Sequence, residues 1–495
     1  MAASGPGNGP SLAGRFAAAI ALTIAFYVLA VAIAAALLAV AILPWIWGHG
    51  NPFVSITGLV LGVTILVSIL PRSMRFTPPG VRIGRDEQPA LVALIEDEAR
   101  SCGEAPPDEI YATFEVNAGV LEVGRRRVMV IGLPLLQLVS ERGLRSVLAH
   151  EFGHYAGGDT KLGPWIHRTR ETIVRTVEEL SDDDDSWTRA LVRQPFVWYG
   201  WAFLRITNAI SRREEFAADA CAALRAGRDV HVATLRRLHA YGPAFDAFWE
   251  NEVSPLLAVG RRPPVGEGFH AFVHAEPIEQ AATAYLEQEL GEGATSPYDS
   301  HPSLAERIAA VRDLSAGAPD DSPPAAALLV DPEALEAAQA VHVLGPDAAQ
   351  LEPVDWAAVG AEVYLERARR LVGTHGELLG DATAGELDAM IDQLGRVAGA
   401  LQQREPELEV AHARDFAAAL IADGLLVALH EDGWSVDAPP AEPVICRRGD
   451  DRVPPHLVVH ELRDGSLTGA GWRERAQALG IAGLALRSGE RTAAG

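Results

Sequence analysis

Lysine is almost absent from this chain of 495 residues, since Lys161 is the only one. Leu162 follows it and Gly158 stands three residues before it. The chain therefore has neither the Gly-Lys-Ser/Thr loop that cradles phosphates nor the Ser-x-x-Lys sequence of serine acyl transfer. Nucleotide hydrolysis and penicillin-type acylation are not expected of it.

Cysteine is also scarce, with only Cys102, Cys221 and Cys446. They are far apart in the sequence, odd in number, and include no Cys-x-x-Cys pair. This distribution supports neither a disulfide framework nor a thiolate zinc site. We expect small buried side chains in a reducing compartment.

Positive charge is outweighed by negative charge, with 42 Lys and Arg against 66 Asp and Glu and a net charge of -24. Such a chain repels nucleic-acid phosphates, and no local basic patch offsets the repulsion. No nucleic-acid partner is expected. The length favours two or three folding units over one compact core.

Charged residues are missing altogether from two stretches, 16–47 and 53–70. Each approaches or exceeds the ~20 residues needed to cross the hydrocarbon of a bilayer, so they predict two transmembrane helices. A cleaved signal peptide is the alternative for the first, but its apolar run is about twice a typical signal core and a second span follows at once. A third stretch, 196–210, is short and contains Arg205. It favours a buried or interfacial amphipathic helix over a further span.

Arginines flank this hairpin on one side only. Arg15 precedes the first span and four arginines follow the second between residues 72 and 85, whereas the loop 48–51 has no Lys or Arg. The positive-inside rule then places both ends of the hairpin in the cytoplasm. We expect a multi-pass protein of the cell membrane whose remaining mass is cytoplasmic.

Hydrophobic periodicity gives a coarse outline of the rest. Residues 88–101 predict a helix, 109–116 and 120–131 predict strands, and 133–155 predict a helix that is broken near 141–143 and ends at Gly157-Gly158. The four aspartates within 181–186 indicate a solvated acidic loop.

Residues 315–325, rich in Pro, Ala and Asp, predict a linker. Helices are expected beyond it at 356–371, 386–402 and 414–429, with strand-like pieces at 443–447 and 456–462. His456 and His460 lie in the last piece, and a strand would give them a structural role.

The chemistry concentrates at His150-Glu151-Phe152-Gly153-His154. Residues four apart share one face of a helix, so His150 and His154 can present two imidazole nitrogens to one zinc ion. Glu151 lies beside them, where its carboxylate can take a proton from water that the ion acidifies to a pKa of about 7. The five residues also arise by chance in a few per cent of chains of this length, so they need support from elsewhere.

A catalytic zinc needs a third protein ligand and one open position. A third histidine six residues after the second would fall on Thr160, which excludes the metzincin pattern. A glutamate on a second helix is the alternative, and Glu215 offers one. Asp219, one turn later, can accept the N–H of a ligand histidine. The other reading of Glu215 and Asp219, an ordinary solvated helix face, would leave the third ligand position unfilled.

Three segments together resemble the HtpX-like and CAAX-prenyl-endopeptidase family of membrane zinc endopeptidases. They are residues 147–154 (VLAHEFGH), 211–220 (SRREEFAADA) and 301–308 (HPSLAERI). The resemblance extends over about 80–314 plus the two apolar stretches. HtpX-type proteins carry two further spans where this chain has only 196–210, and the region after 325 has no counterpart in the family.

The resemblance implies that His150, His154 and Glu215 bind one Zn²⁺ and that Glu151 is the general base. It further implies that Asn117 and Ala118 begin an edge strand that pairs with an extended substrate. His301 and Arg307 fall in the family's third motif, where they could stabilise an oxyanion. A helix cap and a structural ion pair are the alternatives for these two.

The expected fold is α+β and mainly helical: a zincin-like catalytic domain with an N-terminal two-helix transmembrane hairpin and a helical C-terminal extension. The expected limits are a cytoplasmic tail at 1–15, transmembrane helices within 16–75, the metallopeptidase domain at 76–314, the linker at 315–325, and a C-terminal region of unknown function at 326–495.

The expected activity is hydrolysis of membrane or membrane-adjacent polypeptides by a gluzincin-type site, with membrane-protein quality control or stress response as the setting. The lipid bilayer is the other expected partner. A regulatory membrane protease of signalling type and a catalytically silent membrane scaffold are the alternatives.

Overall fold

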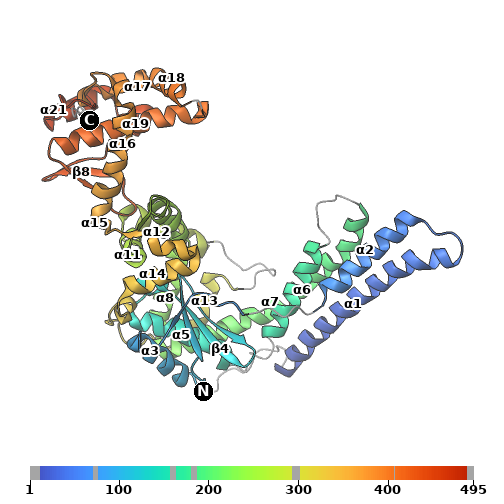
Figure 1. Cartoon of the computed structure of the whole chain (residues 1–495). Coiled ribbons are helices and arrows are strands. Elements are labelled where there is room, and N and C mark those ends of the chain that lie inside the picture. Colours follow the sequence, from blue (N-terminus) through green and yellow to red (C-terminus); the bar gives the residue numbers. More distant parts are fainter. Residues whose placement is uncertain are drawn as a thin grey trace. The chain divides into compact units, whose positions relative to one another are not determined.

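The computed structural model describes residues 12–70, 76–156, 163–179, 187–291, 301–405 and 407–487. It is mainly helical with small sheets (Figure 1). Its contacts divide the chain into unit 1, Met1–Ala240 with Ala284–Val330, and unit 2, Tyr241–Thr283 with Asp331–Gly495. This division differs from the expected limits because Tyr241–Thr283 packs with the C-terminal part of the chain.

The elements of unit 1, in chain order, are α1 (Leu12–Ile46), α2 (Pro52–Ser68), β1 (Val81–Ile83), α3 (Pro89–Ser101), β2 (Glu109–Thr113), β3 (Ala118–Val123), β4 (Arg126–Gly132), α4 (Leu133–Leu138), α5 (Glu141–Ala156), α6 (Gly163–Glu179), α7 (Trp187–Ala226), α8 (Arg228–Tyr241), α13 (Leu304–Val311) and the 3-10 turn η3 (Ala325–Leu328).

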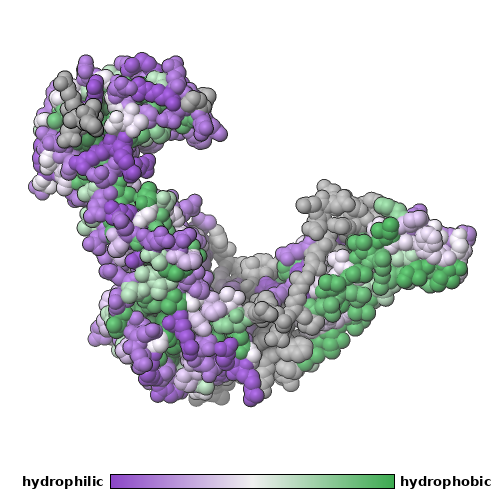
Figure 2. All heavy atoms as spheres, in the orientation of Figure 1, coloured by the Kyte–Doolittle hydropathy of each residue, from purple (hydrophilic) through white to green (hydrophobic). Residues whose placement is uncertain are grey.

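The two N-terminal apolar stretches form helices α1 and α2. Asn51 caps α2 by accepting hydrogen bonds from the backbone N–H groups of the second and third residues after it, and Pro52 supplies a preset first turn. Glycines let the two helices approach closely, since a Cβ added at Gly58 would lie 2.8 Å from the carbonyl oxygen of Leu37. Figure 2 shows the hydrophobic surface that these helices present.

In the part of the chain that the structure describes, one helix is long and apolar enough to cross a membrane, Ile20–Ile46 within α1. Helix α2 is apolar but has only 17 residues. The expected pair of membrane spans is thus a pair of packed helices, of which the first is long enough to span a bilayer by itself.

Helices α6 and α7 pack against this pair (Figure 1). Phe196 and Phe203 of α7 are buried with Phe26 of α1, whereas Trp198 and Trp201 on the opposite face are exposed. The stretch 196–210 therefore belongs to a 40-residue helix that is buried on one face and exposed on the other, as expected of an amphipathic helix.

Unit 1 also contains a four-stranded sheet in the order β1-β2-β4-β3. Strand β2 runs parallel to β4, and β3 pairs with β4 in an antiparallel hairpin turned at Gly124, which has φ 67°. Strand β3 is thus an edge strand, and it contacts α5.

Helix α5 begins after a break at Val139 and Ser140, close to the expected interruption. The Ser140 hydroxyl accepts a hydrogen bond from the N–H of Gly143 at 2.9 Å and caps the new helix. The segment expected to be a linker is fixed here, because the Pro323 carbonyl accepts from the N–H of Glu141 at 2.8 Å and the N–H of Ala325 donates to Val139. Gly157-Gly158 and the aspartates of 181–186 lie outside the described residues.

The remaining elements, in chain order, are α9 (Ala244–Phe248), η2 (Trp249–Val253), α10 (Ser254–Ala258), β5 (Arg261–Arg262), α11 (Val265–Val273), α12 (Glu276–Gly291), α14 (Pro332–Leu344), η4 (Pro346–Gln350), β6 (Glu352–Pro353), α15 (Trp356–Val359), η5 (Gly360–Tyr364), α16 (Leu365–His375), η6 (Gly376–Leu379), η7 (Ala384–Glu386), α17 (Leu387–Asp392), α18 (Leu394–Arg404), α19 (Val410–Glu431), β7 (Ser435–Asp437), β8 (Ile445–Arg448), β9 (Asp451–Val453), α20 (Pro455–Asp464) and α21 (Gly469–Ala478).

Helix α19 is the centre of the C-terminal core. It packs against α16, α18 and α20, and the buried indoles of Trp434 and Trp472 belong to the same apolar cluster. The strand expected over 456–462 is wrong: these residues lie in helix α20, which Pro455 begins and Gly465 ends with φ 84°. His456 and His460 therefore share a helix, where they lie 3.0 Å from Asp423 and 3.5 Å from Asp464, respectively.

Candidate metal centre

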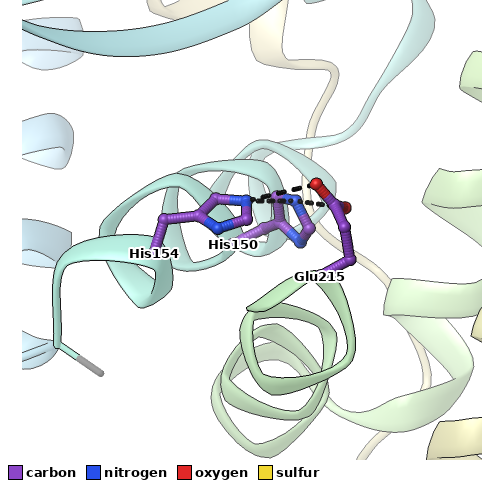
Figure 3. Close-up of side chains that lie close together, drawn as sticks. All are labelled: His150, His154 and Glu215. Carbon is purple, nitrogen blue, oxygen red and sulfur yellow. Dashed lines mark hydrogen bonds and ion pairs between the residues drawn. The ribbon is translucent and has the colours of Figure 1, made fainter. Parts of the chain in front are cut away.

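Three side chains from two helices converge in unit 1 (Figure 3). His150 and His154 lie one turn apart on α5, and Glu215 reaches toward them from α7. One ligand atom from each of the three lies within 4.8 Å of the others. The Nε2 atoms of the histidines are 3.2 Å apart, and the Glu215 oxygens lie 3.5 Å from His150 Nε2 and 3.7 Å from His154 Nε2.

These separations fit a zinc ion. Ligand atoms at the usual zinc distances of about 2.0–2.2 Å and near-tetrahedral angles lie about 3.3–3.6 Å from one another. Two imidazoles and one carboxylate are also the ligand chemistry of catalytic zinc sites. The sequence-predicted ligand set is thus brought together by the fold, with the third ligand on a separate helix.

Close packing of α5 on α7 makes this convergence possible. Gly153 lies between the ligand histidines in the sequence, and a Cβ added there would stand 3.1 Å from the Cα of Ala218. On the opposite side of α5, the side chains of Leu148 and Phe152 are buried. A glycine on the face toward α7 and apolar residues on the other face therefore set the distance between the two ligand-bearing helices.

Asp219 is the charged centre behind the ligands, and its side chain is fully buried. Its Oδ1 lies 3.1 Å from His150 Nδ1, so the ring nitrogen opposite the ligand atom faces a carboxylate. Arg307 of α13 donates to both carboxylate oxygens of Asp219, at 2.9 Å and 2.6 Å. Burial alone would raise the pKa of Asp219, but Arg307 and the two nearby histidines hold it well below its usual range.

His231 of α8 is the second histidine at Asp219. Its Nε2 lies 3.3 Å from Asp219 Oδ1, and its Nδ1 is 2.9 Å from the hydroxyl of Ser146 on α5. Burial lowers the pKa of His231. Sequence reasoning missed this residue, because a histidine on a helix without a recognisable motif gives no signal and only the fold places it here.

His301 is more exposed than the other groups at the site, with 69% of its side chain accessible. Its Nδ1 is hydrogen-bonded to Glu215 at 3.0 Å, and this contact raises the pKa of His301. Ser303 then caps α13 with a reciprocal hydrogen-bond pair to Glu306. The cap fixes the first turn of α13 and so the position of Arg307, which is 11% exposed. His301 thus faces solvent, whereas Arg307 is buried behind the candidate ligands.

Two of the candidate ligand side chains, His154 and Glu215, have pKa values that favour their metal-binding protonation states. Burial and the neighbouring His150 lower the pKa of His154 to about 4, which keeps its imidazole neutral. Burial works to raise the pKa of Glu215, but the hydrogen bond from His301 and the charges of His150 and Arg307 lower it to about 2. A neutral imidazole and an ionised carboxylate are the forms that bind metal.

Glu151 lies on α5 next to His150 and is half-buried. Burial raises the pKa of its carboxyl to about 7, and the nearby charges of His150 and Glu215 act on it in opposite directions. A carboxyl with a pKa near neutrality can both accept and return a proton at physiological pH. The geometry therefore provides an acid–base group next to the candidate ligands.

Asn117 and Ala118 lie where the sequence analysis expected an edge strand. Ala118 is the first residue of β3, and the carbonyl of Asn117 accepts the N–H of Gly132 at 2.8 Å. Strand β3 contacts α5, the helix that carries His150. An extended peptide added to this edge would run alongside the helix that carries the two candidate ligand histidines.

Two histidines and a glutamate that could hold a metal ion, with a second carboxyl beside them, are the residue types that metal-dependent hydrolysis requires. Residues 86–315 match the sequence family described as Peptidase family M48. This range includes every residue of the candidate centre. These residues are therefore similar to peptidase family M48, which confirms the resemblance to HtpX-like metalloproteases.

Relatives named Protease HtpX support this assignment. The protein from Xanthomonas campestris pv. campestris (strain B100) is 29% identical over 238 residues, which cover 45% of this chain and 71% of the relative. Protease HtpX of Xanthomonas axonopodis pv. citri (strain 306) is 28% identical over 244 residues, covering 46% and 73%. That of Stenotrophomonas maltophilia (strain K279a) is 30% identical over 164 residues, covering 30% and 57%. No solved structure matches the chain.

Proposed function

We propose that this chain is a membrane-anchored zinc metalloendopeptidase that hydrolyses polypeptides, with Glu151 as its general base. The observation that carries the proposal is the meeting of His150, His154 and Glu215 at distances that suit one zinc ion. Such an ion supplies Lewis acidity, which acidifies water and polarises a carbonyl oxygen. The remaining parts of the reaction are assigned to side chains of this chain.

Glu151 receives the proton of the attacking water and returns it to the leaving amine. Its partial removal from water, which raises its pKa to about 7, supports both transfers. The edge of β3 from Asn117 and Ala118 holds the substrate backbone extended through main-chain hydrogen bonds. These two elements bring the scissile bond and the base together.

His301 and Arg307 take different roles in this proposal. The exposed His301, hydrogen-bonded to Glu215, is the donor that faces substrate and stabilises the developing oxyanion. Arg307 is a positioning residue, because both of its hydrogen bonds to Asp219 point away from solvent. Asp219 in turn orients the ring of His150.

The membrane anchor consists of α1 and α2 as a transmembrane hairpin, with the peptidase domain on the cytoplasmic side of the cell membrane. The apolar surface of the pair supports the anchor, and the one-sided arginines support the orientation. Reporters fused after Leu70 should be active in the cytoplasm, and activity only outside it would contradict this topology.

Membrane-protein quality control or stress response is the proposed setting. A regulatory protease of signalling type is the alternative within the same chemistry. A silent membrane scaffold is disfavoured, because a scaffold needs neither Glu151 nor the buried contacts that hold Asp219 against His150.

The test is zinc content and casein cleavage by the purified full chain and by Glu151→Gln. We expect the variant to bind zinc normally but to lose about 10²–10⁴-fold in cleavage rate, the usual contribution of a general base. Glu287→Gln is the matched control, since Glu287 is exposed on α12 and should have no effect. Absence of zinc from the wild type, or equal cleavage by Glu151→Gln, would overturn the proposal.

A further inference from the structure

A groove of about 780 Å³ lies between helices α8 and α13 of unit 1. On the side of α8 it is lined by Asp229, Val232, Ala233 and Arg236. These positions follow the first at steps of three, four and seven residues, so they form one stripe along one face of the helix. The stripe places a valine and an alanine between two charged ends.

Helix α13 lines the other side of the groove with the same spacing. Its stripe consists of Ala305, Ile308, Ala309 and Arg312, again at steps of three, four and seven residues from the first. Ala309 is exposed, as is Ala233 on α8, and Ile308 is only partly buried. Small side chains on both helices therefore leave an apolar floor that is open to solvent.

Contacts at one end of the groove fix the direction of the two helices. Arg228, the first residue of α8, donates hydrogen bonds to the carbonyl oxygens of Arg312 and Leu314, at 2.9 Å and 3.3 Å. Its guanidinium also lies 2.8 Å from Asp229. The start of α8 is thus held at the end of α13, so the helices run in opposite directions along the groove. Arg312 then lies at one end of the groove, and Arg236, about two turns along α8, lies toward the other.

Positive charge at the two ends of the groove lacks strong partners. Asp229 offsets Arg228, but Arg236 is exposed and no carboxylate pairs with it in the part of the chain that the structure describes. Arg312 is 77% exposed and has a 3.7 Å contact with Asp313, whose side chain is 93% exposed. Such exposed pairs are weak. Two guanidinium groups are therefore available at the ends of an apolar groove, in a chain whose net charge is -24.

We propose that this groove binds an amphipathic helix of another protein, with an apolar stripe and acidic side chains at both ends of that stripe. A hydrophobic groove accepts such a helix through side chains at positions i, i+3, i+4 and i+7. Each lining stripe extends over seven residue steps, which is about 10 Å of helix and matches about two turns of the bound helix. Carboxylates that flank those turns would pair with Arg236 and Arg312, whereas lysines there would be repelled.

Other faces of the same two helices contact Asp219. His231 lies 3.3 Å from Asp219, and Arg307 donates a hydrogen bond to it at 2.9 Å. Each of these two buried residues directly precedes a residue of the groove, Val232 or Ile308, and one residue step turns a helix by about 100°. A bound helix would therefore brace α8 and α13 from outside without touching the candidate ligands. The inference goes beyond the proposed function, since binding requires neither zinc nor Glu151.

The experiment measures the fluorescence anisotropy of a labelled, hydrocarbon-stapled peptide added to the full chain in micelles of a non-ionic detergent, with protein-free micelles as the blank. The peptide carries leucines at i, i+3, i+4 and i+7 and glutamates on both sides of them. A second peptide has lysines in place of the glutamates. The glutamate peptide should bind saturably and more weakly as salt rises, because salt screens exposed charges. The lysine peptide should not bind to the wild type.

Substitutions in the groove separate docking from adsorption to the micelle. Arg236→Glu and Arg312→Glu should each weaken binding of the glutamate peptide about tenfold, and the double variant should bind the lysine peptide instead. Ala309→Trp should abolish binding of either peptide, because an indole would fill the groove. Arg367→Glu is the matched control, since Arg367 is exposed on α16 and should not affect binding.

Circular dichroism checks that each variant is folded, and the comparison of the two peptides at low and high salt uses the wild type alone. Equal binding of the two peptides by the wild type, no binding of either, or undiminished binding by Ala309→Trp would overturn the proposal. Self-association of the chain that Ala309→Trp abolishes, without any binding of peptide, would assign the groove to a second copy of the chain and also overturn it.

Discussion

The metal-site helices and the C-terminal core bury different kinds of side chain. Around α5, α7 and α13 the buried groups include the charged side chains of Glu215, Asp219 and Arg307, each within reach of an oppositely charged partner or a histidine. Around α19 the buried cluster is apolar, with Trp434 and Trp472 among its largest members, and Asp423, which faces His456, is the one buried carboxylate that this helix adds in the described residues.

This difference separates two ways of specifying structure. Hydrophobic burial is non-directional and tolerates exchange of similar side chains. Buried charges require partners at fixed positions, so the metal-site network is correct only when all of its members are present. The chemistry of the chain therefore lies in the region where single polar substitutions should be most harmful.

Removal of Arg307 should have the largest effect on the stability of the metal-site region. Arg307→Gln leaves the buried Asp219 without its bidentate partner, and breaking a buried charge pair on one side costs about 3–5 kcal/mol. Unit 1 should unfold at lower denaturant concentration. Arg312→Gln is the control, because Arg312 is 77% exposed in its side chain. Equal denaturation midpoints for the two variants would show that the pair contributes little.

A core truncation in unit 2 should have the complementary effect. Leu425 is fully buried in α19, and Leu425→Ala should destabilise the surrounding core by about 2–5 kcal/mol. Hydrogen exchange across 410–431 should accelerate while casein cleavage stays at the wild-type rate. Leu457→Ala, at a more exposed position, is the control. Loss of cleavage in a folded Leu425→Ala protein would refute the separation of chemistry from this core.

His231 should matter through the metal rather than through packing alone. His231→Ala removes a contact to Asp219, and loss of such an outer contact typically weakens metal binding about 10–100-fold. Zinc affinity is measured by chelator competition, with His239→Ala on the same helix as the control. His231→Gln, which keeps an N–H donor, should recover part of the affinity. Unchanged affinity in His231→Ala would limit the residue to a packing role.

Glu336 offers a test through pH, because it is a buried carboxylate of unit 2 without an opposite charge at its oxygens. Burial raises its pKa to about 7 although the N–H groups of Val265 and Gly266 donate to it. The folded state then binds the proton more tightly than the unfolded state, so the stabilising effect is complete below about pH 4.5. It is lost as pH rises to about 7, with a slope of at most about 1.4 kcal/mol per pH unit.

The measurement is the free energy of unfolding from pH 4.5 to 8 for the wild type and for Glu336→Gln. Only the difference between the two curves is attributed to Glu336, because histidines titrate in the same interval. A difference that grows as pH falls toward 4.5 in the wild type's favour is expected, and parallel curves would contradict the role of burial.

Much of this fold could be predicted from the sequence, because several elements have strong local patterns. Apolar runs give α1 and α2 to within a few residues, and the break before α5 falls where the helical pattern fails, near residue 141. The segment around His456 misled because its valines favour a strand, whereas packing against α19 and a first-turn proline make it a helix.

In the candidate site, too, some residues could be predicted from local motifs and others could not. His150, Glu151 and His154 lie in one motif, and Glu215 and Asp219 in another, so their roles could be predicted before their distances were known. The position of His231 next to Asp219 and Ser146 depends on how α5, α7 and α8 pack. No local pattern encodes such contacts between distant residues, so sequence reasoning could not find them.

The most direct test of the central claim is the zinc affinity of the purified full chain and of Glu215→Ala, measured by chelator competition. The account predicts one zinc ion per chain in the wild type and a large loss of affinity in the variant, with Glu214→Ala on the same helix as the comparison. A wild type that binds no zinc, or a Glu215→Ala protein that binds it as tightly, would contradict the metal centre proposed here.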